Sequence, residues 1–194
     1  MALVQATCKW GASYSQPATD LIGRIKPELT KPGDSWTGTC VNPSYLSPGY
    51  YRAFAKFVSA DLAFWSSAAD NAYTTLNAVA NTNTGLVPNW SQNGQPGACG
   101  TGSNRGDFGY DALRSPWRIA TDYLWWGTPQ AKTLLGKQLA WVESLGGNDS
   151  LTKDIYSLSG TPIGPYAPSA ALVGTFAAAS ALLVLRRSAA CARW

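Results

Sequence analysis

The sequence contains no histidine, and this absence removes several familiar kinds of catalytic site. Ser-His-Asp and Cys-His sites both need an imidazole, and ordinary zinc sites use it as a ligand. Acid–base chemistry in this chain must therefore use carboxylates, tyrosine, lysine or cysteine. The sequence predicts neither a metal site nor a cofactor.

Charged residues are also few, at 13% of the chain, and the formal net charge is only +4. No cluster of Lys and Arg of the kind that grips phosphates is present, so nucleic acid is not an expected partner. Hydrophobic residues make up 45% of the 194 positions. That is enough for a sizeable core, and we expect a single domain over residues 1–194.

The chain has four cysteines and no CxxC spacing, which argues against metal and redox motifs. Cys40 and Cys99 both lie in polar or Gly-rich stretches. The sequence leaves open whether they form a disulfide; if they do, an oxidising compartment is indicated. The first residues, MALVQATCKWG, lack the basic start and long apolar stretch of a signal peptide.

Aromatic residues, in contrast, are abundant: the chain has nine tryptophans and nine tyrosines. A core of this size does not need that many large rings. Such rings combine an apolar face with a polar edge, and they also stack on flat apolar surfaces. Sugar rings present such surfaces.

The pattern of helix signals predicts a mostly helical protein. A Ser or Thr followed closely by Pro is typical of a helix start, and we interpret four such pairs as helix starts. Apolar residues also recur at helical spacing between Leu62 and Leu76. Residues 91–109 form a long Gly-rich loop, and loops of that length are usually functional or disordered. We expect an all-α toroid or bundle with function on its loops. The four predicted helix starts are Ser15–Pro17, Ser47–Pro48, Ser115–Pro116 and Thr128–Pro129.

An apolar run from Ala170 to Leu185 is closed by Arg186 and Arg187. A membrane span needs about 20 apolar residues, and this run is shorter and interrupted by polar residues. A buried helix is therefore favoured over a membrane anchor. A helical interaction or membrane-associated protein stays an alternative, which detergent-dependent solubility would favour.

The stretch FGYDALRSPWRIATDYLWWG, residues 108–127, concentrates charge and large aromatics at a helix start. Arg114 lies close enough in sequence to Asp111 to favour its charged form, and such a carboxylate can act as a general base on water. The structural alternative is that Asp111 pairs with Arg114 or Arg118 only to pin a loop. Asp122 lies further along the helix, where we expect a solvated face.

The segment YDALRSPWRIATDYLWWG resembles the signature of glycoside hydrolase family 8, which contains inverting endoglucanases, chitosanases, xylanases and lichenases. Further segments resemble the family in the same order, and the similarity runs from about residue 3 to about residue 178. The resemblance implies an (α/α)6 toroid with an open substrate cleft. The other matching segments are KPGDSW at 31–36, NPSYLSPGYYRAFA at 42–55, NTGLVPNW at 83–90 and YAPSAALVGTFA at 166–177.

The resemblance also implies roles for five residues. Asp111 takes the place of the general base, Arg114 orients it, and Tyr110 lines the cleft beside the scissile bond. Trp36 and Tyr45 fall where the family places sugar-stacking aromatics; packing within loops is the alternative for both. The implied substrate is a β-1,4-linked glycan such as cellulose, and the implied location is extracellular or periplasmic.

The sequence departs from the family in its carboxylates. Inverting hydrolysis needs a second carboxyl group, roughly 6.5 to 9.5 Å from the base, as general acid. The family's acid lies in an early segment of the kind SEGxGYG, followed by a DGD segment, and neither is present here. The two glutamates, Glu28 and Glu143, match no such motif.

The first residues, ALVQATCKWG, resemble the helix that follows the DGD segment. The chain therefore resembles the C-terminal portion of a longer family member, a partial toroid. We expect weak or no activity from it alone, with a non-catalytic glycan-binding remnant as the alternative. Apolar faces left exposed in a partial toroid predict self-association.

Overall fold

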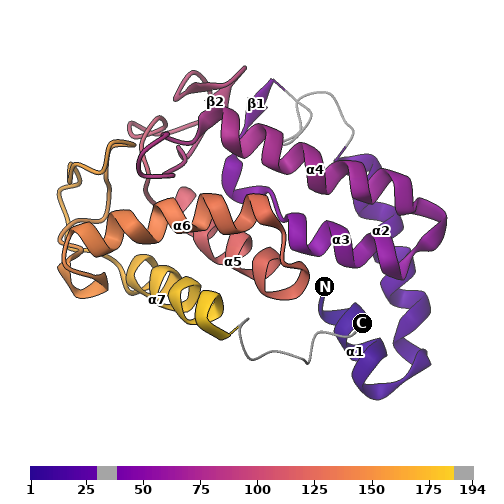
Figure 1. Ribbon diagram of the computed structural model, residues 1–194. Helices are drawn as coiled ribbons and strands as arrows, with labels where there is room; N and C mark the ends of the chain where they lie inside the picture. The colour runs from indigo at the N-terminus through magenta and orange to yellow at the C-terminus, as the bar shows by residue number, and fades with distance from the viewer. Residues whose placement is uncertain (30–38, 186–194) are drawn as a thin grey trace.

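The computed structural model describes residues 1–29 and 39–185 and is mostly helical (Figure 1). Trp36 and the residues after 185 lie outside the described part. Short 3₁₀ turns, including η2 (Pro43–Tyr45) and η4 (Ala112–Arg114), join several of the helices. The α-helices of the described part are α1 (Ala2–Trp10), α2 (Ser15–Glu28), α3 (Pro48–Phe57), α4 (Leu62–Val79), α5 (Ser115–Trp126), α6 (Pro129–Ser144) and α7 (Ala170–Leu185).

The predicted helix starts are confirmed to within one residue. Ser47 and Thr128 are the N-cap residues of α3 and α6, and a proline follows each of them directly. Helices α2 and α5 begin instead at Ser15 and Ser115, so these serines lie inside the first turn. In none of these four helices does the N-cap side chain make a capping hydrogen bond. The Ser47 hydroxyl is used elsewhere, because Arg118 donates to it.

The helices pack around two groups of aromatic side chains. Helix α3 contacts α4 and α5, and α5 also contacts α6 and α7. Trp65 of α4 is fully buried against Phe54 and Phe64, with ring centroids 5.1 and 5.0 Å away. A second group, Phe108 and its neighbours, lies between α6 and α7. Its members are Phe108, Trp141, Tyr156 and Phe176.

The Gly-rich loop over residues 91–109 carries a small sheet. Strand β1 (Cys40–Val41) pairs antiparallel with β2 (Ser91–Gln92), which pairs antiparallel with β3 (Gln95–Pro96). A disulfide joins Cys40 to Cys99, with the Cα atoms 5.7 Å apart. Of the two alternatives left by the sequence, the disulfide is therefore the one formed. It ties the loop to the segment that leads into α3.

The apolar C-terminal run forms α7, whose Leu172, Phe176 and Ala179 are fully buried. The prediction of a buried helix is confirmed. In residues 1–29 and 39–185, no helix combines the length and the apolar character needed to cross a membrane.

The prediction that Asp122 lies on a solvated face is wrong. Its side chain is fully buried in α5, and the Tyr73 hydroxyl donates a 2.6 Å hydrogen bond to it. Arg52 Nε lies 3.4 Å from the other carboxylate oxygen. The helix packs against α3, α6 and α7, so several of its sides are covered, and sequence periodicity could not reveal this. Burial raises the pKa of Asp122, and hydrogen bonds from Tyr73 and Thr128 and the nearby Arg52 only partly offset it.

Candidate active site

The backbone at Asp111 is held by a single buried amide side chain. Asp111 precedes η4 and α5, and its N–H donates to Asn89 Oδ1 at 3.0 Å. The N–H of Ala112 donates to the same oxygen at 2.9 Å. Asn89 Nδ2 in turn donates to the carbonyl of Asn104 at 2.8 Å. Asn89 therefore fixes where the Asp111 side chain leaves the backbone.

The Asp111 carboxylate forms an ion pair with Arg114, as the sequence predicted. Arg114 Nη2 donates to Asp111 Oδ1, and Arg114 Nε donates to Ser44 Oγ and to the Asp111 carbonyl, both at 3.1 Å. Both side chains are 36% exposed, so water reaches the pair. Arg118, the other predicted partner, donates to Ser47 and lies over the Trp117 ring.

Aromatic side chains surround this ion pair. The Arg114 guanidinium lies 5.2 Å from the centroid of the Tyr45 ring, and Tyr45 meets Trp90 edge-on at 6.3 Å. Tyr45 is 45% exposed and Tyr110 57% exposed. The exposed parts of these rings can stack on a sugar, whereas Trp36 lies outside the described residues. A pocket of about 220 Å³ adjoins Asp111, lined by Asn89, Trp90, Thr101, Gly102, Ser103, Asn104, Tyr110 and Asp111.

One glycine lets the Gly-rich loop cover Trp90. Gly100 has a φ of +85°, and a Cβ there would overlap the Trp90 ring and lie 2.8 Å from Trp90 Cβ. Gly100 follows Cys99 of the disulfide directly. The covalent link and the glycine together keep the loop against this wall of the pocket.

Asp154 also belongs to the site, through the Tyr110 hydroxyl, which donates to its Oδ2. Sequence reasoning missed this residue, since it lies 44 positions from Tyr110 along the chain. It also missed the roles of Asn89 and Trp90. Asn89 and Trp90 are the last two residues of the NTGLVPNW segment. The resemblance of that segment to the family could have pointed to them, whereas their residue types alone could not.

The two glutamates of the chain do not line the pocket at Asp111. Glu28 ends α2, and Glu143 is exposed near the end of α6. Asp107 lies four positions before Asp111, and burial raises its pKa. No group of three or more His, Cys, Asp or Glu that could hold a metal ion occurs in these residues.

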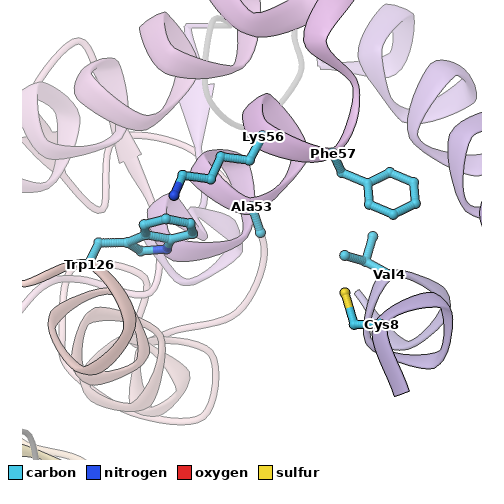
Figure 2. Close-up of a pocket in the computed structure, with 6 residues that line it drawn as sticks. All are labelled: Val4, Cys8, Ala53, Lys56, Phe57 and Trp126. Carbon is cyan, nitrogen blue, oxygen red and sulfur yellow. The ribbon is translucent and has the colours of Figure 1, made fainter. Parts of the chain in front are cut away.

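A second pocket, of about 290 Å³, lies at the opposite end of α5 (Figure 2). Val4 and Cys8 approach it from α1, and Lys56 of α3 reaches over Trp126, with Nζ 4.9 Å from the ring centroid. Its lining is apolar apart from Lys56 and contains no carboxylate. The pocket at Asp111, in contrast, holds a carboxylate paired with an arginine.

Comparisons with known proteins show the family of the chain. The family model "Glycosyl hydrolases family 8" matches residues 2–181. Endoglucanase 2 of Ruminiclostridium josui is 40% identical over 176 residues, covering 84% of this chain and 36% of that protein. Beta-glucanase of Niallia circulans is 30% identical, covering 84% of this chain and 46% of that protein.

Solved structures give the same answer for the fold. The β-1,3-1,4-glucanase from Paenibacillus sp. X4 matches with a TM-score of 0.80 and 27% identity, over 95% of this chain and 55% of that one. A family 8 xylobiose complex from Teredinibacter turnerae matches with a TM-score of 0.76 and 27% identity, and the match covers 92% of this chain and 53% of that one. The chain thus spans about a third to just over half of these relatives. The all-α fold is that of a partial (α/α)6 toroid, and the chain belongs to glycoside hydrolase family 8.

Proposed function

We propose that this chain takes part in the hydrolysis of β-1,4-linked glycans, with Asp111 as the general base of an inverting reaction. The observation that carries the proposal is the Asp111–Arg114 ion pair beside a pocket lined by Tyr110 and Trp90. The endoglucanase relatives favour cellulose or a related β-glucan as the substrate class.

The contacts of Asp111 suit a base that acts on water. In an inverting reaction, one carboxylate takes a proton from the water that attacks the anomeric carbon, while a second carboxyl group protonates the leaving oxygen. Arg114 pairs with Oδ1 and so orients the carboxylate. Its 36% exposure leaves room for the water. Tyr45 and Tyr110, with Trp36 in the same proposed role, stack on the sugar rings.

Neither glutamate of the chain lines the pocket at Asp111. We propose that the chain alone lacks a general acid matched to this base. General acid catalysis contributes roughly 10²- to 10⁴-fold. We therefore propose that hydrolysis of unactivated glycans by this chain alone is weak or undetectable.

A substrate that needs no acid isolates the role of Asp111. Fluoride leaves without a proton, so β-cellobiosyl fluoride bypasses the missing acid. We expect the chain to release fluoride with inversion at the anomeric carbon. Asp111→Asn should lower that rate by roughly 10²- to 10⁴-fold. The exposed Asp149 provides the matched control, Asp149→Asn. Equal rates for the chain and Asp111→Asn would contradict the proposed base.

Reducing-sugar release from carboxymethyl cellulose, lichenan, xylan and chitosan tests the missing acid separately. We expect no release by the folded chain. Release that Asp111→Asn abolishes would mean that an acid is recruited, with Glu28, Glu143 or a partner chain to be tested next.

The second candidate function is glycan binding without catalysis. The exposed rings of Tyr45 and Tyr110 favour it, since stacking needs no acid. In that case the chain binds cello-oligosaccharides, and Tyr45→Ala weakens this binding. The unaltered chain and Asp111→Asn then release fluoride at the same rate. We propose an extracellular or periplasmic location for either function, supported by the Cys40–Cys99 disulfide, since such bonds persist in oxidising compartments.

A further inference from the structure

Tyr110 and Asp154 lie opposite each other because of a short antiparallel pairing. Phe108 and Tyr156 exchange two backbone hydrogen bonds, each 2.9 Å long. When two residues are paired across antiparallel segments, the residue n positions after one of them lies opposite the residue n positions before the other. Tyr110 follows Phe108 by two positions, and Asp154 precedes Tyr156 by two. The buried Phe108–Tyr156 pair therefore sets the register that brings the hydroxyl to the carboxylate.

The Asp154 carboxylate is held on its other side as well. Its residue is only 3% exposed, and its Oδ1 accepts the N–H of Tyr166 at 3.2 Å. The Asp154 N–H also donates to the Tyr166 carbonyl at 3.2 Å. Gly164 leaves the necessary space, because a Cβ there would overlap Oδ1 and lie 2.7 Å from the N of Ile155. Both oxygens of Asp154 are thus engaged and its position is fixed.

This contact determines what the Tyr110 hydroxyl offers a ligand. A phenol has one proton to donate, and Tyr110 gives it to Asp154. The lone pairs of its oxygen are then available only as acceptors. The residue is 57% exposed and lines the pocket at Asp111, so a group that meets this oxygen there must be a donor.

We propose that Asp154 is a positioning residue, which fixes the Tyr110 hydroxyl as an acceptor for a sugar hydroxyl bound beside Asp111. That the ligand is a sugar rests on the proposed function, whereas the contact between Tyr110 and Asp154 does not depend on it. The hydrogen bond to Asp154 is also the main cause that raises the pKa of Tyr110. Burial pushes the pKa of Asp154 up, but the hydrogen bonds from Tyr110 and Tyr166 outweigh it and leave that pKa lowered.

The contact is tested directly by titrating Tyr110. In the chain labelled with ¹³Cζ-tyrosine, Tyr110→Phe identifies the Tyr110 signal. We expect Asp154→Asn to lower the pH at which that signal titrates, because the charged acceptor is gone. Asp149→Asn, a change of the same type at an exposed position, should leave it unchanged. An unchanged Tyr110 titration in folded Asp154→Asn would overturn the proposal.

The consequence for the ligand is tested with cello-oligosaccharide binding. Tyr110→Phe removes the hydroxyl that accepts a hydrogen bond from the sugar. It should therefore raise the Kd for the oligosaccharide by roughly five- to tenfold. Asp154→Asn should raise it similarly, and the double variant should add little, because both changes remove one contact. Additive effects of the two changes would overturn the coupling. If the unaltered chain binds no oligosaccharide, the proposed function fails, while the Tyr110 titration still decides the contact.

Discussion

At the scale of single residues, the site depends on polar side chains that each hold more than one partner. Asn89 accepts from two successive N–H groups at Asp111 and Ala112 and donates to Asn104. Ser44 Oγ accepts a hydrogen bond from Arg114 Nε and donates one to Asn42 Oδ1 at 2.6 Å. A buried group left without its partner costs more than one hydrogen bond contributes, so such residues tolerate little change.

Asp122 leads to a prediction about pH. Its pKa is raised in the folded chain, chiefly by burial, so the folded state binds this proton more tightly than the unfolded state. The stability contributed by the protonated form is full below the unfolded pKa of about 3.9 and is lost as pH rises through the folded pKa. Asp122→Asn, which mimics the neutral form, should therefore gain stability relative to the unaltered chain as pH rises.

Urea unfolding from pH 4 to 7, followed by tryptophan fluorescence, measures this difference in the free energy of unfolding. Asp20→Asn, at an exposed position of α2, is the control and should show little change with pH. If the difference in free energy of unfolding between the unaltered chain and Asp122→Asn stays constant with pH, the raised pKa of Asp122 is contradicted.

At the scale of elements, the site lies where loops meet rather than on a helix face. The hairpin of β2 and β3 and the segment from Leu151 to Tyr166 approach the start of α5 from different parts of the chain. The Cys40–Cys99 disulfide and the Phe108–Tyr156 backbone pair are two of the links that hold them. Loops held this way can keep a carboxylate in place without a regular sheet.

The disulfide is expected to contribute strongly to stability. It joins cysteines 59 positions apart, and closing a loop of that length stabilises a folded chain by about 4 kcal/mol in the chain-entropy treatment. Replacing both Cys40 and Cys99 with Ser should lower the free energy of unfolding by roughly 2 to 4 kcal/mol. Cys8→Ser, at an exposed free thiol, is the matched control. A double variant as stable as that control would show that the bond contributes nothing.

At the scale of the whole molecule, large apolar side chains remain on the surface. Trp10 is 71% exposed, Tyr166 68%, Leu62 53% and Trp117 41%. Exposed apolar area of this kind marks interaction surfaces or aggregation sites. The predicted self-association therefore has specific residues to test.

Sedimentation velocity over a wide range of protein concentration should show association that grows with concentration. Trp10→Ser combined with Trp117→Ser should weaken it, because these changes remove the largest exposed rings on α1 and α5. Gln130→Ser, at an exposed polar position, should have no effect. A single monomeric species at every concentration would refute the prediction.

Features set by neighbours in the chain could be read from the sequence. The Ser–Pro and Thr–Pro pairs mark helix starts because proline fits the first turn. Asp111 and Arg114 are three positions apart, so the turn between them brings them together. The apolar run from Ala170 to Leu185 predicts a buried helix because it is short for a membrane span and interrupted by polar residues.

Contacts between distant segments required the tertiary structure. Asn89 reaches Asp111 across 22 positions and Asp154 reaches Tyr110 across 44, and no local pattern encodes either distance. Asp122 is buried because α3, α6 and α7 cover α5, although its position in the helix sequence resembles a solvent-facing one. Local preferences act through the backbone of a few residues, whereas burial and long-range hydrogen bonds depend on which elements pack together.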